Sequence, residues 1–268
     1  MPPHLGATER EQGPTIVLLH GFTHTAQSWG PFASRLAEHH QVVALDLPGH
    51  GSAADVTTDL WGAADRVLDQ VGDQPFVALG YSMGGRVALH LALRQPPRLR
   101  GLVLIGATAG IEDDAERADR LEADTWRAGR LEAELDLDEF LAEWLAGPLF
   151  ANLSPEQSQL AARQQNRPAG LAASLRLMGT GAQTPLWDRL AEISVPTLVL
   201  VGSHDVKFTR IGRRLKQGIP RSRLVTIGRS GHACHLEHPR STALAVEAFL
   251  ASLTDDLRPV PPRGAVRG

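Results

Sequence analysis

Cysteine and lysine are scarce in this sequence. Cys234 is the single cysteine among 268 residues, which excludes an intrachain disulfide and makes a reducing cytoplasm the simplest location. Lysine occurs only at Lys207 and Lys216, so arginine carries nearly all of the positive charge. The formal net charge of −3 at pH 7 leaves no basic excess, and we therefore expect neither a nucleic acid nor a membrane surface as a partner.

Long apolar segments are absent as well. No run approaches the roughly 20 residues that a helix needs to span a bilayer, and the polar stretch before Pro14 has no signal-peptide core. No internal repeat is visible. The chain has 43% hydrophobic and 21% charged residues and is long enough for one large domain with an insertion. We therefore expect a soluble globular protein with a substantial core.

Short apolar runs recur along the chain, and each ends at a glycine-bearing or acidic loop. The runs are Thr15–Gly21, Gln41–Gly51, Pro75–Gly80, Leu99–Gly106, Val195–Gly202 and Ser222–Gly228. Continuous apolar runs without alternation are typical of strands that are covered on both faces. The helical patterns between them are Pro31–Glu38, Leu60–Val71, Gly84–Arg94, Thr209–Gln217 and Ser241–Leu253. This alternation predicts an α/β fold with a mostly parallel, doubly wound sheet.

One long interval, from about Gly110 to about Asp188, contains no strand-like run. Helices are predicted over Glu112–Arg130 and Asp138–Ala146, and Ser154–Gln157 has the pattern of a capping box that opens a third helix. We therefore expect a helical cap inserted into the sheet domain. The predicted division is a first core part over 1–109, the cap over 110–188, a second core part over 189–254 and a disordered tail over 255–268.

Ser82 lies in the stretch GYSMG, between a predicted strand and a predicted helix. This is the G-x-S-x-G pattern, in which Gly80 and Gly84 let the chain turn sharply and the helix pack closely on the strand. Such a turn presents the hydroxyl at a helix N-terminus, where developing negative charge is favoured. The sequence therefore predicts that Ser82 is a catalytic residue rather than a serine in an ordinary turn.

A catalytic serine needs a base and an acid that orients the base. Asp205 follows the strand VPTLVLVG, and His232 lies in the loop directly after the last predicted strand, so the chain order is Ser, acid, His. Nearby alternatives to His232 are His204, His235 and His238. His232 and His235 form an H-x-x-H pair, but no further ligand set is close in sequence, so we expect no metal.

The oxyanion hole is expected from backbone amides. The stretch LLHGF ends the first strong strand, so the amide of Phe22 should lie at the carboxyl edge of the sheet. The amide of Met83, directly after the serine, is the second expected donor. The loop DLPGHG, Asp46–Gly51, reaches the same edge, and we interpret it as mainly architectural.

Arg86 follows the serine by one helical turn. An arginine in the first turn of a helix faces the positive end of the helix dipole, which is unfavourable. On a strand–helix elbow it should also be partly buried, so an anionic partner is expected to offset both costs. The alternative is a side chain that reaches solvent.

Several longer stretches carry a more specific signal. They are GYSMGGRVALHLA, AERADRLEADTW, WLAGPLFANLSPEQ, SLRLMGTGAQTPLWDRL, GSHDVKF and SGHACHLEHP. Together they resemble the 2-succinyl-6-hydroxy-2,4-cyclohexadiene-1-carboxylate synthase family of menaquinone biosynthesis, in the α/β-hydrolase superfamily. The similarity runs from about Thr15 to Leu253. It implies a lyase that eliminates pyruvate from 2-succinyl-5-enolpyruvyl-6-hydroxy-3-cyclohexene-1-carboxylate without a metal or an organic cofactor.

The resemblance also implies substrate-binding residues: arginines for the three carboxylates of the substrate, and aromatic residues that line the pocket. These residues are Arg86, Arg120, Arg163, Trp144 and Tyr81. Arginine suits planar carboxylates through paired hydrogen bonds. Lys207 matches the family's motif without an assigned step, and the short segment before Thr15 leaves open whether an opening edge strand is present.

The predicted mechanism uses Ser82 as a general base. His232, held by Asp205, would activate the serine to remove a proton next to the succinyl ketone of a small polycarboxylate. Two alternatives remain at this point. One is a serine esterase or C–C bond hydrolase that forms an acyl-enzyme, and the other is a catalytically silent ligand receptor on the same fold.

Overall fold

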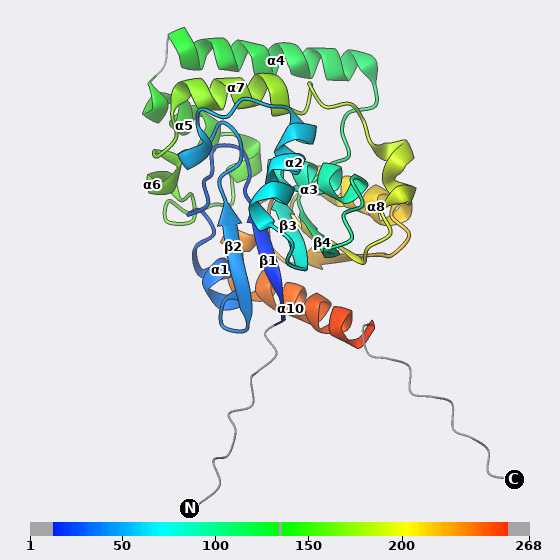
Figure 1. The fold of residues 1–268 in the computed structure, drawn as a ribbon. Helices are drawn as coiled ribbons and strands as arrows, with labels where there is room; N and C mark the ends of the chain where they lie inside the picture. Colours follow the sequence, from blue (N-terminus) through cyan, green and yellow to red (C-terminus); the bar gives the residue numbers. More distant parts are fainter. Residues whose placement is uncertain (1–12, 134–135, 257–268) are drawn as a thin grey trace, which may run out of the picture.

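The computed structural model describes residues 13–133 and 136–256, and a six-stranded sheet lies at its centre (Figure 1). The strands are β1 (Gly13–Leu19), β2 (His40–Leu45), β3 (Phe76–Tyr81), β4 (Leu99–Ile105), β5 (Thr197–Gly202) and β6 (Ser222–Ile227). All of their pairings are parallel, and their order is β2-β1-β3-β4-β5-β6. The predicted parallel α/β sheet is confirmed, and all six predicted strands are present.

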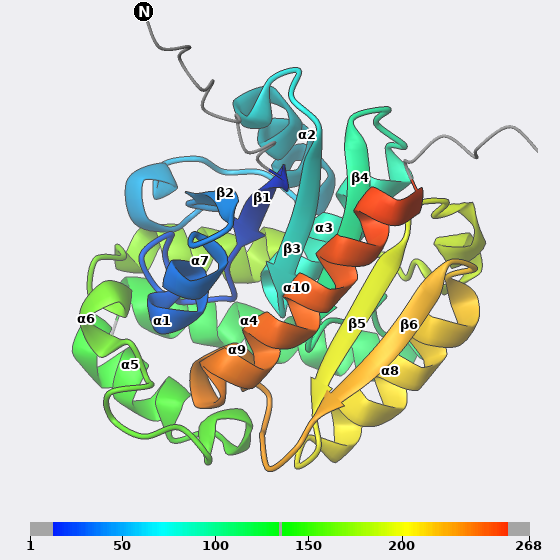
Figure 2. The same ribbon diagram turned by 90° about the horizontal axis from the view of Figure 1, so that it is seen from below.

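Helices cover both faces of the sheet. On one face lie α2 (Leu60–Val71), α3 (Met83–Leu93) and α8 (Val206–Gly218). On the other face lie α1 (Gly30–Leu36), α9 (Cys234–Glu237) and α10 (Pro239–Asp256), and Figure 2 shows α10 running across the sheet. None of the described helices is both long and apolar enough to cross a membrane.

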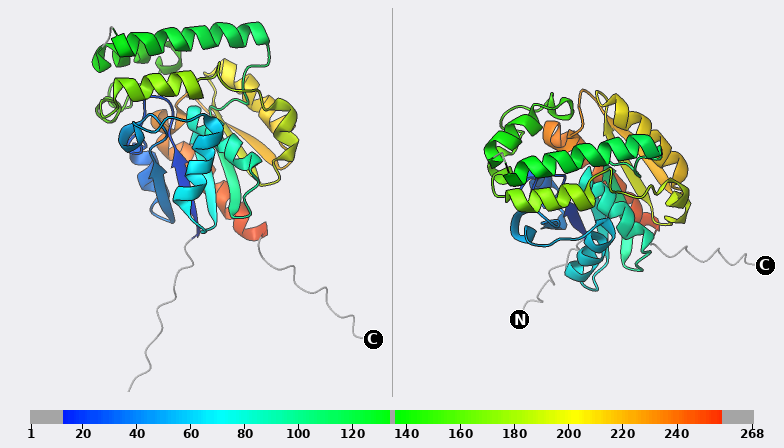
Figure 3. Two further views of the ribbon diagram at one scale, coloured as in Figure 1. Left: turned by 45° about the horizontal axis from the view of Figure 1, so that its top comes forward. Right: turned by 90° about the horizontal axis from the view of Figure 1, so that it is seen from above.

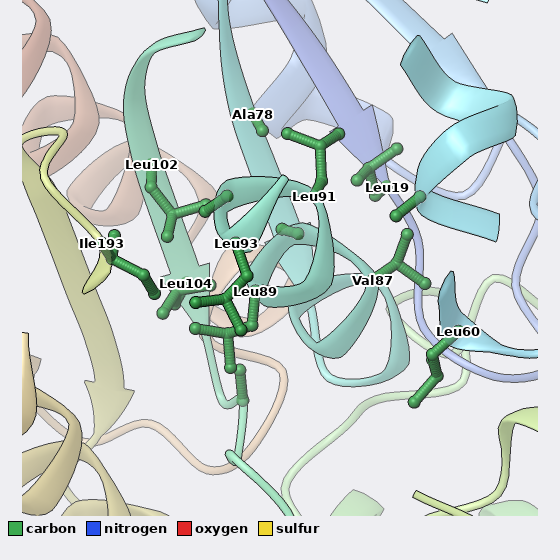
Figure 4. Packing of buried hydrophobic residues seen from close by; sticks show 14 of the residues in the cluster. Leu19, Leu60, Ala78, Val87, Leu89, Leu91, Leu93, Leu102, Leu104 and Ile193 are labelled. Atoms are coloured by element: carbon green, nitrogen blue, oxygen red, sulfur yellow. The ribbon is translucent and has the colours of Figure 1, made fainter. Parts of the chain in front are cut away.

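The residues of β3 explain why its sequence shows no alternation. Phe76 and Ala78 belong to the core cluster on the α3 face, whereas Val77 and Leu79 belong to the cluster on the α10 face. Both faces are therefore apolar, as expected for a central parallel strand. Figure 4 shows the packing on the α3 side, where every residue of the helix is buried. Burying one large apolar side chain contributes about 1.5–3 kcal/mol, so this helix fixes the position of the elbow that precedes it.

The chain between β4 and β5 forms a helical cap over the carboxyl ends of the strands (Figures 1 and 3). Its α-helices are α4 (Asp114–Ala133), α5 (Leu137–Leu145), α6 (Leu160–Arg163) and α7 (Pro168–Met178). Among the described residues, the short 3-10 helices are η1 (Gly51–Ala53), η2 (Pro148–Phe150) and η3 (Trp187–Glu192). Helices α4, α5 and α7 share a small core of their own, to which Leu131, Phe140 and Leu171 belong.

The structure of the cap differs from the prediction in two ways: one helix begins later than expected, and one helix was not predicted. Ser154 and Gln157 exchange the two hydrogen bonds of a capping box (3.0 and 3.3 Å), but the chain then makes turns, and α6 begins only at Leu160. Gln159 has a φ of +57°, which interrupts the helix. The sequence interpretation also missed α7 as a separate helix.

The last helix extends beyond the end predicted for it at Leu253. Helix α10 ends at Asp256, so the first two residues of the predicted tail are helical. The remainder of that prediction, residues 257–268, lies outside the described residues, as does the segment before residue 13.

Candidate active site

Ser82 lies at a strained turn between β3 and α3. Its φ of +51° and ψ of −107° are unfavourable for a residue with a side chain. A Cβ at Gly80 would lie 2.2 Å from the carbonyl oxygen of Gly84, and one at Gly84 would lie 1.9 Å from that of Leu19. The turn can therefore form only with glycine at both positions, and it lifts the hydroxyl above the sheet edge.

The structure brings Ser82, His232 and Asp205 together. Nε2 of His232 lies 3.2 Å from Oγ of Ser82, and Nδ1 lies 2.8 Å from Oδ2 of Asp205. When Nδ1 donates its proton to the carboxylate, Nε2 is left to accept the serine proton. The other carboxylate oxygen, Oδ1, caps α8 by accepting from the amide of Phe208 (3.1 Å), so the helix holds the acid in place.

The alternative histidines lie elsewhere. His204 is exposed, and Nε2 of His238 lies 2.9 Å from the carbonyl oxygen of Arg229. His235 is buried between Tyr81 and Trp29, with ring centroids 4.4 and 5.1 Å away. Within residues 13–133 and 136–256, no group of three or more His, Cys, Asp or Glu side chains is arranged to hold a metal ion.

Phe22 and Met83 both line the cavity beside the serine. The carbonyl oxygen of Gly21 accepts from the amide of His24 (3.1 Å) and from Nδ1 of His20 (2.8 Å). Nδ1 of His20 is the donor because Nε2 accepts from the amide of Leu47 (3.0 Å). In a planar trans peptide the N–H points away from the C=O. Two bonds on the Gly21 oxygen therefore fix the direction of the Phe22 N–H.

A cavity of about 920 Å³ opens above the serine, between the sheet edge and the cap. Its lining includes all three elements of the expected site: His232 with Ser82, the oxyanion-hole residues, and cationic side chains. The predicted site residues found there are Phe22, Ser82, Met83, Arg86, Arg120, Trp144 and His232, and Lys207, to which no role was assigned, lines the cavity as well. Charged side chains of both signs also line it: besides Arg86, Arg120 and Lys207, they are Arg210, Arg214, Glu112, Asp113 and Glu116.

Arg86 is a buried cation in the wall of this cavity. Only 6% of its surface is exposed, and Nη1 lies 3.4 Å from Oε1 of Gln183. No ion pair involves Arg86 in the part of the chain that the structure describes. Burial, and secondarily the nearby Arg120, lower the pKa of Arg86 to about 9, so it is still charged at pH 7. A buried charge of this kind favours an anionic ligand.

Arg120 and Trp144 reach the cavity from the cap. Nε of Arg120 lies 2.9 Å from both carboxylate oxygens of Asp124, which is fully buried. This contact fixes the stem of the arginine on α4. Trp144, on α5, packs against Phe22 with ring centroids 5.0 Å apart, so the cap touches the loop that carries one oxyanion amide.

Two residues expected to bind substrate do not line the cavity. Tyr81 ends β3 and points to the α10 face with Val77 and Leu79, as the two-residue period of a strand requires, so it lies behind His232 (ring centroids 5.4 Å apart). Arg163, the last residue of α6 in the cap, is fully buried, and its guanidinium contacts other protein groups. In this structure neither side chain is placed to contact a ligand in the cavity.

Two features in or next to the cavity were not anticipated from the sequence. Gln183, within the GTGAQTPLWDRL stretch, holds Arg86, and its position in that motif was the only available signal. Arg214 on α8 lies over Trp187 (3.9 Å to the ring centroid) and pairs with Glu112 (2.8 Å), which joins the core to the start of the cap. The loop Asp46–Gly51 was interpreted as architectural, and the three hydrogen bonds that Asp46 accepts from Ala26 and Ser52 agree with this.

Comparison with known proteins places the chain in a family. Residues 14–239 match the α/β-hydrolase fold family. The 2-succinyl-6-hydroxy-2,4-cyclohexadiene-1-carboxylate synthase of Serratia proteamaculans is 35% identical, with 89% of this chain and 94% of that protein covered. The solved structure of MenH from S. aureus has a TM-score of 0.85 at 32% identity and covers 92% of this chain and 96% of that one.

A thermophilic esterase from Thermogutta terrifontis, solved with malate bound, is more distant. It has a TM-score of 0.77 at 25% identity and covers 90% of this chain and 91% of that one. The synthases are thus nearer in sequence than this esterase. With its serine elbow, its triad geometry and this degree of identity, the chain belongs to the 2-succinyl-6-hydroxy-2,4-cyclohexadiene-1-carboxylate synthase family of α/β-hydrolase-fold proteins.

Proposed function

We propose that the protein is a carbon–oxygen lyase of menaquinone biosynthesis. It eliminates pyruvate from 2-succinyl-5-enolpyruvyl-6-hydroxy-3-cyclohexene-1-carboxylate and gives 2-succinyl-6-hydroxy-2,4-cyclohexadiene-1-carboxylate. The observation that carries this proposal is Arg86, a buried cation in the same cavity as Ser82. Arg86 forms no ion pair among the described residues, and a tricarboxylate substrate would supply its counter-charge, whereas a neutral ester would not.

Ser82 starts the reaction as a general base. It removes the proton from the ring carbon next to the succinyl ketone, while Nε2 of His232 takes the serine's own proton (Oγ to Nε2, 3.2 Å). The C–H electron pair moves into the ketone and forms an enolate. The carboxylate of Asp205, 2.8 Å from Nδ1, stabilises the imidazolium that results.

The enolate oxygen is held by the amides of Phe22 and Met83. Donors that are fixed before the reaction stabilise this charge without reorganisation, and such a contribution is typically worth about 10²–10³ in kcat for each donor. Collapse of the enolate rebuilds the ketone, forms the second ring double bond and breaks the C–O bond to the enolpyruvyl group. The leaving enolate takes up a proton and becomes pyruvate, so no acyl-enzyme is needed.

Arg86 and Arg120 are proposed to hold carboxylates from opposite sides of the cavity. Arg86 belongs to the sheet domain and Arg120 to α4 of the cap. Binding across the two parts would fix the substrate with its acidic carbon near the serine. A small polycarboxylate is thus the one partner we propose, and we place the reaction in the cytoplasm, where the buried thiol of Cys234 would stay reduced.

Pyruvate release tests the proposal directly. The purified protein is offered the enolpyruvyl substrate, and pyruvate is followed through NADH oxidation by added lactate dehydrogenase. Intact-mass spectra recorded during turnover should show unmodified protein. A substrate-derived adduct on Ser82 that forms and decays at the turnover rate, without pyruvate, would indicate the esterase or C–C bond hydrolase instead.

A further inference from the structure

Thr23 lies in the loop that follows β1 (residues 20–29, the β1 loop), and its polar groups are all bound by other segments. Its amide donates to Nε2 of His50 (3.2 Å), and its carbonyl oxygen accepts from Nδ2 of Asn166 (2.6 Å). Its hydroxyl accepts from Nη1 of Arg163. Thr23 also has a φ of +67°, which is unfavourable for a β-branched residue. These contacts therefore hold a loop conformation that the residue would not adopt alone.

Arg163 supplies one of the contacts with Thr23 and also binds the next residue of the loop. Besides Thr23, its guanidinium contacts Nε2 of His24, and Nε donates to the carbonyl oxygen of Ser158 (2.7 Å). Burial lowers the pKa of His24 well below its usual range, so Nε2 of the neutral ring can accept. The side chain of Arg163 thus joins α6 to two successive residues of the β1 loop.

Thr23 and His24 belong to the turn that fixes the direction of the Phe22 N–H, one of the two oxyanion donors. The amide of His24 is one of the two donors to the Gly21 oxygen, and Thr23 lies between His24 and Phe22. If the loop moved, the Gly21–Phe22 peptide could rotate, and the Phe22 N–H would then point away from the cavity. The geometry of the donor consequently depends on the contact between Arg163 and the loop.

We propose that Arg163 is a positioning residue for the oxyanion hole, acting through Thr23 and His24, and not a ligand of a substrate carboxylate. Seating of α6 on the β1 loop and formation of the hole are then one event. The inference rests on the proposed function only in assuming that negative charge develops beside the amide of Phe22.

Kinetics of three variants test this role. Arg163→Met should lower kcat at least tenfold, and at most by the roughly 10²–10³ that loss of one oxyanion donor costs, and it should change KM much less. Arg163→Lys should recover part of kcat, because it keeps the charge and one donor. Thr23→Val removes the hydroxyl at nearly constant shape, and the double variant with Arg163→Met should be no slower than Arg163→Met alone, since both act through one contact.

Arg167→Met is the matched control. Arg167 also joins the cap to the core, through an exposed ion pair with Asp55 (2.6 Å), and among the described residues it forms no hydrogen bond or ion pair with the β1 loop. Its loss should leave kcat and KM unchanged. The proposal is wrong if Arg163→Met raises KM tenfold at constant kcat, because that result identifies a substrate ligand. It is equally wrong if Arg163→Lys and Thr23→Val, which conserve the fold best, both retain the full kcat.

A substrate-independent measurement separates this inference from the proposed function. In protein labelled with 15N-phenylalanine, the amide signal of Phe22 should shift in Arg163→Lys and Thr23→Val and stay in place in Arg167→Met. An unmoved signal would refute the positioning role even if pyruvate is released normally. A shifted signal in a protein that releases no pyruvate would refute the proposed function and leave the positioning role standing.

Discussion

At the scale of single residues, the triad should behave as one unit. Ser82→Ala or His232→Ala is expected to lower kcat for pyruvate release by about 10²–10⁴, the usual contribution of a general base. The double variant should be little worse than either single one, because each change already removes the same proton transfer (Oγ to Nε2, 3.2 Å). Coupled pyruvate assays on the folded variants check this. Multiplicative losses would speak against a shared step.

Gln183 gives a second test, in which stability and affinity should change in opposite directions. Gln183→Glu places a carboxylate about 3.4 Å from Nη1 of Arg86, a buried cation without an ion pair among the described residues. The new pair should raise the melting temperature. It should also raise KM for the tricarboxylate at least about tenfold, since it replaces a charge-assisted contact of about 1.5–3 kcal/mol.

The control is Gln165→Glu, which adds the same charge at an exposed position of the cap. Calorimetry and steady-state kinetics on both variants separate a local effect from a change in overall charge. If Gln183→Glu binds substrate normally, Arg86 is not a carboxylate ligand.

At the scale of elements, the elbow between β3 and α3 depends on its glycines. Gly84→Ala would place a Cβ 1.9 Å from the carbonyl oxygen of Leu19, in backbone that cannot move alone. We expect a loss of about 4 kcal/mol in the free energy of unfolding. A Cβ at Gly129, within α4, would meet no other atom within 4 Å, and Gly129→Ala should stabilise the protein by about 0.5–1 kcal/mol. Urea denaturation of both variants tests this contrast, and equal effects would contradict it.

Local sequence signals predicted the sheet better than the cap. The strands are continuous apolar runs because both of their faces are buried, and their chain order placed Asp205 and His232 at the edge that carries Ser82. Helix α7 was missed because it contacts both the cap core and the sheet domain, so Leu171 and Met178 mark no single apolar stripe.

The misplaced site residues have two different physical causes. The direction of Tyr81 follows from the two-residue period of its strand and could have been read from the sequence. The position of Arg163 could not, because its contact with Thr23 joins residues that are 140 positions apart. Family resemblance predicts which residues matter, but only tertiary packing decides which of them reach the cavity.

At the scale of the whole molecule, buried histidines should set the acid limit of stability. Burial lowers the pKa of His20 and His90 to about 4, and that of His50 and His235 to about 3. The unfolded chain binds these protons near pH 6.5, whereas the folded chain does not. Stability is therefore full above that pH and falls as the pH drops towards 4, by up to about 1.4 kcal/mol per pH unit for each histidine.

Melting temperatures between pH 8 and pH 4.5 provide the measurement. The curve should be nearly flat above pH 7 and should fall steeply below pH 6. Replacement of the exposed His39 by glutamine should leave the curve unchanged. A melting temperature that stays constant down to pH 5 would show that these rings are not held neutral in the fold.

The point where the cap joins the sheet domain has a further consequence. The amide of Leu186 donates to the carbonyl oxygen of Ala109 (2.7 Å), and the indole of Trp187 donates to that of Gly110 (3.0 Å), so the chain leaves and re-enters the sheet domain at one place. To the rest of the fold, everything between these residues is a single closed loop, however long it is. The gene segment that encodes the cap can therefore be exchanged as one piece for another. The exchange would give a different cavity above an unchanged Ser82, provided that the new cap contains a residue that binds the β1 loop as Arg163 does.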